Sequence, residues 1–191
     1  MPWDTDATRA RLLGSATTHF AADGYAGARV DAIARTAGVN KERIYPYFGD
    51  KAGLFAAVVA AQVEHFLHGI ELTGPGEQAV GVLAGILFDR AHEDPRLPRL
   101  LAWESLELDE PVAAVARAKG CAEMVDTLRR LLPGLGREEA EALLLSVIAI
   151  AVLDECLPHL RTLVAPRISR ARRRELVIAQ ARALARMAAT S

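Results

Sequence analysis

The chain has 191 residues, of which 51% are hydrophobic and only 5% are aromatic. This length allows a sizeable core, and the abundance of Ala and Leu with few aromatic residues favours helices over sheets. The net charge of -1 excludes a protein that a strong overall positive field draws to nucleic acid, so any DNA binding must come from a local patch.

Apolar residues recur at helical spacing along most of the chain, and glycines, prolines and capping residues separate the segments. Gly24 is expected to stop the first helix and Gly38 the second. Asn40 and Asp50 are good N-caps for the next two helices. After the first helix, the expected helices cover about residues 30–37, 40–48, 50–66, 77–93, 96–108, 111–132, 137–157 and 169–189.

Residues 30–55 carry the most informative motif, two short helices joined by a turn that contains Gly38. A helix, a tight turn and a second helix form the common DNA-binding supersecondary unit. Ile33 and Ala34 can pack against Ile44 across the turn. The second helix then presents polar groups outward at its N-terminus, where a recognition helix meets base edges. These groups belong to Asn40, Lys41, Glu42 and Arg43.

Residues 8–58 resemble the N-terminal domain of the Tet repressor (TetR) family. The matching residues are Phe20, Gly24-Tyr25, Ile33-Ala34, Ala37-Gly38-Val39, Ile44-Tyr45, Tyr47-Phe48, Lys51 and Leu54-Phe55. The resemblance implies an all-α fold, with a three-helix helix-turn-helix DNA-binding domain over residues 1–50 and a larger ligand-binding and dimerisation domain over 51–191. It also implies a transcriptional regulator and not an enzyme. We expect a repressor that a small-molecule effector releases from double-stranded operator DNA.

By this resemblance, the start of the second motif helix contacts bases and nearby phosphates, and the residues beyond it contact the DNA backbone. The implied DNA-binding residues are Asn40, Lys41, Glu42, Arg43, Tyr45, Tyr47 and Lys51. Arg29 replaces a capping Ser or Thr, which weakens the cap but offers a guanidinium to phosphate. Glu42 either accepts a hydrogen bond from cytosine N4 or only stabilises the first helical turn. Pro46 removes a helical hydrogen bond, so the recognition helix is expected to tighten or end there.

Residues 142–153 are apolar all round the expected helix, apart from Ser146. Such a helix is buried on every side, which suggests that one face packs on its own domain and another on a partner subunit. The resemblance implies a homodimer in which the last two helices form a four-helix interface; the alternative is a purely internal core. The candidate interface residues are Leu144, Val147, Ile148, Ala151, Leu184 and Met187.

Residues 77–132 hold more apolar positions than one thin layer needs, and Gly81, Gly85 and Gly120 can leave room between the helices. Small-molecule sites are usually apolar cavities with a few polar anchors. The candidate lining residues are Phe88, His92, Trp103, Glu104, Cys121 and Met124. Each of them alone is more often core packing or surface.

Other clusters favour structural interpretations. Arg170 and residues 172–174 form either a second DNA site or, as we favour, a solvated face partly paired with Glu138, Glu139 and Glu141. The two cysteines are expected as buried thiols, with a redox switch or an intersubunit disulfide as the alternative. No metal site is expected, because no second His lies at ligand spacing from His92 on its helix. No cofactor and no catalytic constellation are expected either.

Met1–Asp4 shows no basic segment leading into an apolar one, and the apolar run of 142–153 is shorter than the about 20 residues that span a bilayer. We therefore expect a cytoplasmic protein without membrane contact. An alternative from another class is a small helical enzyme or binding protein whose helix-turn-helix is only structural. It would predict a turn poor in basic groups, which Lys41 and Arg43 contradict.

Overall fold

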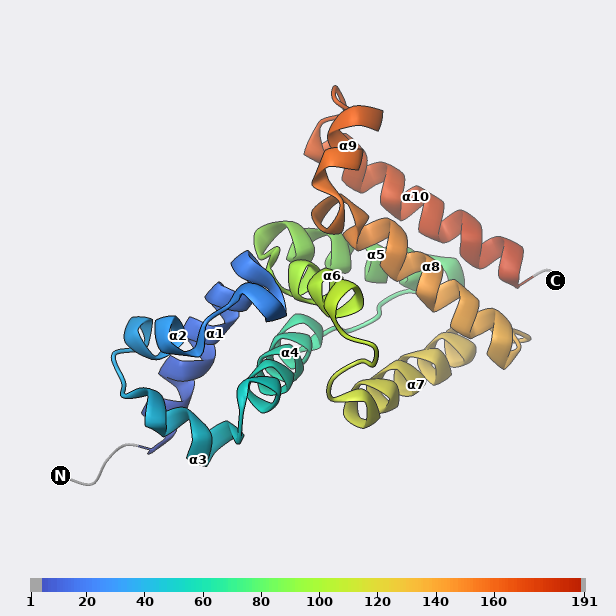
Figure 1. Ribbon diagram of the computed structural model, residues 1–191. Coiled ribbons are helices and arrows are strands. Elements are labelled where there is room, and N and C mark those ends of the chain that lie inside the picture. Colours follow the sequence, from blue (N-terminus) through green and yellow to red (C-terminus); the bar gives the residue numbers. More distant parts are fainter. Residues whose placement is uncertain (1–4, 190–191) are drawn as a thin grey trace. The chain divides into compact units, whose positions relative to one another are not determined.

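The computed structural model describes residues 5–189, and every regular element within that range is a helix (Figure 1). Met1–Asp4, for which no targeting segment was expected, lies outside the described residues. The helices are α1 (Thr5–Gly27), α2 (Val30–Thr36), η1 (Lys41–Arg43), α3 (Ile44–Phe48), α4 (Lys51–Leu67), α5 (Gly76–Glu93), α6 (Arg96–Glu107), α7 (Ala114–Leu131), α8 (Arg137–Cys156), α9 (Pro158–Val164) and α10 (Arg170–Ala188). The all-α prediction is confirmed.

The chain forms two compact units, each built from two stretches of sequence. The first unit runs to His65 and also contains Arg96–Ala116, so that α6 packs with the N-terminal helices. The second unit contains Phe66–Pro95 and the chain from Arg117 onward. The functional division predicted at residue 50 covers only part of the first compact unit and stays a prediction.

The core of the first unit joins helices that are far apart in the sequence. Leu12, Phe20, Ile44 and Phe55 are fully buried there, as is Leu100 of α6. The rings of Phe20 and Phe55 pack edge to face with centroids 5.0 Å apart. Full burial of a Leu or Phe side chain stabilises a fold by roughly 1.5–3 kcal/mol. Leu100 therefore makes α6 an integral part of the unit that carries the helix-turn-helix.

Gly24 turns the chain out of the main part of α1. Its φ of 74° and ψ of 178° lie in a region that only glycine adopts readily. The helical geometry is thus interrupted at the residue where the sequence predicts a stop. A Cβ on Gly24 would lie 2.8 Å from Glu107 Oε1 and 3.0 Å from Trp103 Cδ2. The Ala26 N–H donates to Glu107 Oε2 at 2.9 Å, so two α6 side chains hold this turn.

Replacing Gly24 with alanine is expected to lower the free energy of unfolding by about 1–3 kcal/mol, because the backbone strain alone is of that size. Gly14 offers a matched control in the same helix, since a Cβ there meets nothing within 4 Å. Gly14→Ala should stabilise by about 0.5–1 kcal/mol, the usual helical preference for Ala. Urea denaturation measures both changes. Equal effects of the two substitutions would show that the Gly24 turn is not strained.

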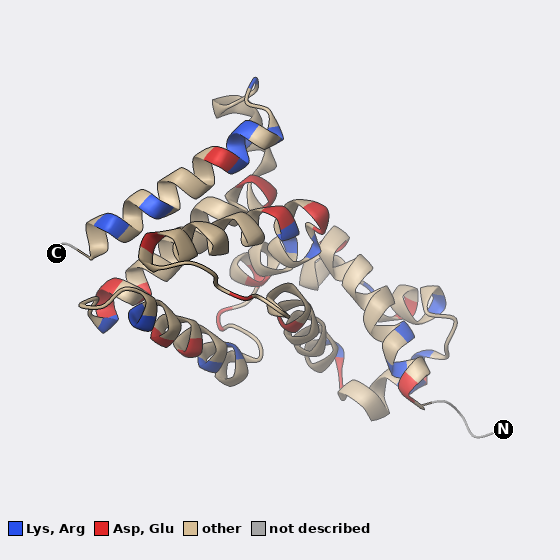
Figure 2. Cartoon of the chain, turned by 180° about the vertical axis from the view of Figure 1, so that it is seen from behind, with Lys and Arg blue, Asp and Glu red and all other residues tan. Residues whose placement is uncertain are grey.

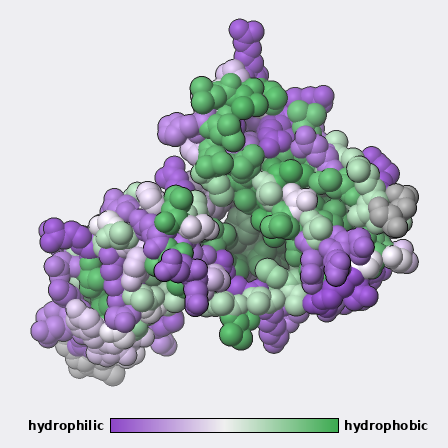
Figure 3. Space-filling model, turned by 45° about the vertical axis from the view of Figure 1, so that its right-hand side comes forward, coloured by the Kyte–Doolittle hydropathy of each residue, from purple (hydrophilic) through white to green (hydrophobic). Residues whose placement is uncertain are grey.

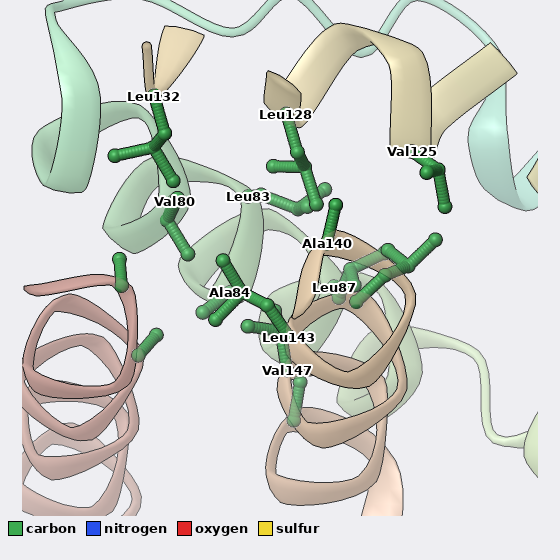
Figure 4. Close-up of a cluster of buried hydrophobic side chains, with 14 of the residues drawn as sticks. Val80, Leu83, Ala84, Leu87, Val125, Leu128, Leu132, Ala140, Leu143 and Val147 are labelled. Carbon is green, nitrogen blue, oxygen red and sulfur yellow. The ribbon is translucent and has the colours of Figure 1, made fainter. Parts of the chain in front are cut away.

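The core of the second unit is formed by α5, α7, α8 and α10. Figure 4 shows Leu83 and Leu87 of α5, Leu128 of α7 and Leu143 of α8 directed into one cluster. From α10, Val177, Ala181 and Ala185 are fully buried in the same core. Each of α8 and α10 packs only one side into this core, and each also carries exposed residues.

Gly81 and Gly85 do not leave room for a ligand, so that prediction was wrong. A Cβ on Gly81 would lie 2.6 Å from Arg182 Nε, and one on Gly85 would lie 3.1 Å from Ile178 Cδ1. Both glycines therefore allow the close approach of α5 and α10. Only at Gly120, on α7, would a Cβ have nothing within 4 Å among these three glycines.

The arginines at the start of α10 are ion-paired, but the predicted glutamate partners were wrong. Arg173 pairs with Asp154 at 3.1 Å, and Arg174 pairs with Asp89 at 2.8 Å. The start of α10 lies beside the end of α8, whereas Glu138, Glu139 and Glu141 lie at the other end of that helix. Figure 2 shows the basic residues spaced along α10.

Three further expectations need correction. The helix α9 was not predicted, and α7 begins at Ala114 rather than at Pro111. Cys121 is exposed rather than buried, while Cys156 is half-buried, and neither forms a disulfide within residues 5–189. Burial, with the nearby Glu155 carboxylate, raises the pKa of the Cys156 thiol above its ordinary value.

Among residues 5–189, no helix is long and apolar enough to cross a membrane.

Candidate nucleic-acid interface

The turn between α2 and η1 has the geometry of a helix-turn-helix. Gly38 adopts a φ of +66°, which a side chain would resist. The Val39 N–H donates to the Ala34 carbonyl at 3.0 Å and closes the turn. Ile33, Ala34 and Ile44 are buried together, as the sequence predicts. The two helices are thus fixed against each other by a small apolar seam and one tight turn.

The second helix of the motif begins at an intact cap. The Glu42 N–H donates to Asn40 Oδ1 at 3.0 Å, which confirms the predicted N-cap. Asn40, Lys41 and Glu42 are exposed, Arg43 is half-buried, and Ile44 is fully buried. The apolar side of this helix therefore faces the core and its first polar turn faces solvent.

The recognition helix was expected either to tighten or to end at Pro46. It does not end there. A tight 3-10 turn over Lys41–Arg43 lies before it, and α3 continues through Pro46 to Phe48. The ring nitrogen of Pro46 has no hydrogen to donate to Glu42, four residues earlier. A first turn that uses i to i-3 bonds does not need that donor: Arg43 N donates to Asn40 O at 2.9 Å, and Ile44 N donates to Lys41 O.

Lys41 carries a partner that the sequence analysis did not identify. Its Nζ lies 2.8 Å from Oδ1 of Asp31 on α2, and both side chains are about half exposed. The hydrogen bond and charge of Lys41 hold the pKa of the Asp31 carboxyl below its ordinary 3.8, with help from Arg29 and Arg35. The same contact raises the pKa of Lys41. The ion pair therefore persists at neutral pH, and it is lost when the pH falls through the lowered pKa of Asp31 or rises through the raised pKa of Lys41.

Arg29 and the residues after the recognition helix have distinct environments. Arg29 is exposed at the start of α2 and makes no side-chain cap, as expected for an arginine. Lys51 Nζ donates to the Ala26 carbonyl at 3.1 Å and lies 5.1 Å from the centre of the Tyr25 ring. Tyr45 is 48% exposed, whereas Tyr47 is half-buried. Lys51 thus ties the Tyr25–Ala26 turn, and its predicted phosphate contact would add to this bond or replace it.

Besides Asp31, sequence reasoning missed a basic residue near the motif, Arg9. The guanidinium of Arg9 lies over the Phe48 ring at 5.6 Å from its centre. This stacking brings a charge from α1 to the end of α3. Its signal in the sequence is weak, because Arg9 lies outside the motif. Asp31 had a clearer signal, since an acidic residue at the start of α2 can reach the first turn after the Gly38 bend.

The residues predicted to line a ligand cavity fall in both compact units. Trp103 packs on Gly24 in the first unit, and the buried Glu104 accepts a hydrogen bond from Val112 N at 2.8 Å. In the second unit, Phe88 and His92 line a hollow of about 210 Å³ together with residues of α8, α9 and α10. Met124 packs against the core and Cys121 is exposed. No described group of three or more His, Cys, Asp or Glu side chains is arranged to hold a metal ion.

The residues predicted for a dimer interface divide by burial. Leu144, Val147 and Ala151 are buried in the core of their own unit, and Ile148 and Leu184 pack partly against it. Met187 is 67% exposed. The exposed apolar positions of α8 are instead Ala142, Leu145, Ala149 and Leu153, which we call the outer stripe of α8.

Comparison with known proteins identifies two matching family models. One, described as bacterial regulatory proteins of the tetR family, matches residues 12–58. The other, described as the tetracyclin repressor-like C-terminal domain, matches residues 80–183. The two models cover the helix-turn-helix and most of the second compact unit.

Named relatives include a repressor and an activator. The HTH-type transcriptional repressor SCO4008 of Streptomyces coelicolor is 39% identical over 105 residues, which are 54% of this chain and 53% of the relative. The HTH-type transcriptional activator FasR of Mycolicibacterium smegmatis is 28% identical over 77% of this chain and 70% of its own. The chain thus spans about half the length of the first relative.

A solved structure supports the fold. The transcriptional regulator SCO4942 of Streptomyces coelicolor superposes with a TM-score of 0.75 at 29% identity, covering 93% of this chain and 97% of that one. The similarity therefore extends over both compact units and is not confined to the helix-turn-helix.

Proposed function

Because the chain belongs to the tetR family of bacterial regulatory proteins, whose members are DNA-binding transcription factors rather than enzymes, we propose that it is a transcriptional repressor. It binds double-stranded operator DNA as a homodimer, and a small-molecule effector releases it. As a regulator of bacterial genes, it acts in the cytoplasm. The similarity to a named repressor over half of the chain favours repression over activation.

The observation that carries this proposal is the capped, exposed first turn of the recognition helix. Asn40, Lys41 and Glu42 face solvent while Ile44 anchors the helix to the core. A helix presented in this way can enter the major groove with its N-terminal residues toward base edges. Arg29, Arg43, Tyr45, Tyr47 and Lys51 would then bind the flanking bases and phosphates.

The direct test is fluorescence anisotropy with DNA from upstream of the chain's own gene, repeated over a range of salt concentrations. Affinity should fall linearly with the logarithm of salt, because binding releases counterions from phosphate. A promoter-reporter assay gives the direction of regulation, and repression is expected. Absence of binding to any upstream fragment would instead favour a helical enzyme or binding protein with a structural helix-turn-helix.

We propose that an apolar or amphipathic molecule binds among the central helices. Phe88, His92, Cys121 and Met124 are the candidate contacts in the second compact unit, and Trp103 and Glu104 are those in the first. We propose a route for its effect within the first unit. Trp103 and Glu107 lie on one helix, α6, and both touch the Gly24–Ala26 turn that precedes α2. Movement of α6 would therefore disturb the base of the helix-turn-helix.

Trp103 also reports on this route. In a Trp3→Phe variant it is the remaining tryptophan, since the chain has two. An effector that lowers DNA affinity should change the Trp103 emission, and operator DNA should weaken effector binding by the same factor. An effector that releases DNA without changing that emission, while Trp103→Ala responds normally, would remove Trp103 and α6 from the response.

The homodimer is proposed to form through the outer faces of α8 and α10. The outer stripe of α8 presents apolar side chains at helical spacing, and Leu145 is 70% exposed. On α10, Arg182 lies over Gly81 and Arg186 pairs with Glu77 at 2.8 Å. These arginines are turned toward α5, which leaves Ala179 and Met187 exposed beside them. A two-fold interface needs such a self-complementary apolar surface.

A further inference from the structure

The short helix α9 is amphipathic in the reverse of the usual sense. Its Pro158, Arg161 and Thr162, spaced three and four residues apart, line the hollow shared with α5, α8 and α10. Its apolar residues lie on the opposite side of the helix: Leu160 is 45% exposed, Leu163 is 80% and Val164 is 75%. A surface helix normally turns its apolar stripe toward its own core.

The inward side of α9 explains why the helix is held in this orientation. Arg161 Nη2 donates to the Ile168 carbonyl at 3.3 Å and closes the connection to α10. The hollow beneath contains the Arg173–Asp154 pair and the contact of His92 Nδ1 with Glu155 Oε1 at 3.0 Å. Polar groups therefore occupy the space where leucines would otherwise pack, and the leucines of α9 are left facing outward.

The exposed leucines continue the outer stripe of α8. Leu145, Ala149 and Leu153 are followed by Leu157, which is 49% exposed, and then by Leu160. Figure 3 shows hydrophobic surface near the top of the molecule, beneath a hydrophilic projection and in the region where Figure 1 places α9, and further hydrophobic surface lies below it. Contiguous apolar surface of this kind marks an interaction site rather than ordinary surface.

We propose that α9 packs against a second copy of this chain and extends the dimer interface beyond α8 and α10. The proposal rests on the proposed homodimer. The apolar surface of α9, defined by Leu157, Leu160, Leu163 and Val164, directly follows the outer stripe of α8 along the chain, and all four of its residues are exposed. Residues 157–169 contain no Trp, Tyr or Lys. Of their two arginines, Arg161 lines the inner hollow and only Arg167 is exposed, so few of the groups that anchor a peripheral helix at a lipid surface are present.

The test is the dimer dissociation constant measured by sedimentation equilibrium. The double variant Leu163→Glu/Val164→Glu should raise it by about tenfold or more, because carboxylates would be buried without partners. Both positions are at least 75% exposed in the single chain, so the monomer should stay folded. The matched control is Leu106→Glu/Val115→Glu, which alters residues that are 77% and 88% exposed in the first unit and should leave the constant unchanged.

A second measurement detects α9 in the interface directly. The amides of Leu157 and of residues 159–164 should exchange hydrogen more slowly in the wild-type dimer than in a Leu145→Arg monomer. If Leu145→Arg dissociates the dimer but the α9 variant does not, α9 lies outside the interface and this proposal fails while the dimer stands. A monomeric wild type would remove the dimer itself. Binding of the wild type to anionic vesicles that the α9 variant loses would assign the surface to lipid and also overturn the proposal.

Discussion

Lys41→Ala is expected to weaken operator binding by about 5- to 100-fold, and Asp31→Asn is expected to strengthen it. Lys41 lies in the exposed first turn of the recognition helix, where loss of one base contact costs about 1–3 kcal/mol. Asp31 holds its ammonium at 2.8 Å and brings a negative charge close to where DNA phosphates would lie. Removing that charge frees Lys41 and removes a repulsion, so the two substitutions act in opposite directions.

Affinity for operator and for unrelated DNA, each over a salt series, separates the contributions. If Lys41 contacts a phosphate, both DNAs should lose affinity equally and the salt slope should fall by about one. If it reads a base, only the operator should be affected. Asp31→Asn should raise affinity for both DNAs. Lys119→Ala, at a lysine that is 79% exposed in the second unit, is the control and should change neither. Unchanged binding in the Lys41 variant would show that this turn does not face DNA.

Leu145→Arg is expected to convert the dimer to a folded monomer, with the dissociation constant raised by about 100-fold or more. Leu145 is 70% exposed in the single chain, so its substitution leaves the monomer core intact. In a two-fold interface, the change would bury two guanidinium groups without partners. Circular dichroism checks that the helices persist, and light scattering gives the mass.

Two variants sharpen this result. Val147→Arg places the same charge on the same helix at a fully buried position and should unfold the second unit. Leu106→Arg places the same charge at a residue that is 77% exposed in the first unit, and it should neither dissociate the dimer nor unfold the protein. A Leu145→Arg protein that remains dimeric would move the interface away from the outer stripe of α8. DNA affinity should fall together with dimerisation, because a dimer binds two half-sites at once.

The helix-turn-helix was predictable because local chemistry determines it. The caps at Asn40 and Asp50 and the bends at Gly24 and Gly38 depend on neighbouring residues only. Ile33 and Ile44 are separated by a single turn, so their contact could also be predicted from spacing. The same locality explains why most helix ends were predicted within a few residues.

The second unit was harder to predict because its pairings join distant segments. The residues 142–153 are apolar on all sides, and the sequence gives no sign of which face α5, α7 and α10 cover. Leu144 and Leu145 are adjacent and equivalent in type, yet the first is 6% exposed and the second 70%. Gly85 was interpreted as open space although Ile178, far along the chain, lies against it. Because polar residues lie on the inner side of α9, the periodicity of apolar residues did not predict this helix.

The discontinuous first unit has a consequence for synthesis of the protein. Leu100 is fully buried in its core, and Glu107 bonds to the Ala26 amide. Domains fold as units while the chain emerges from the ribosome. The stretch Phe66–Pro95, which belongs to the other unit, must therefore be made before α6 can return to the N-terminal helices. The nascent chain therefore completes the unit that carries the helix-turn-helix only after more than half of its length has been translated.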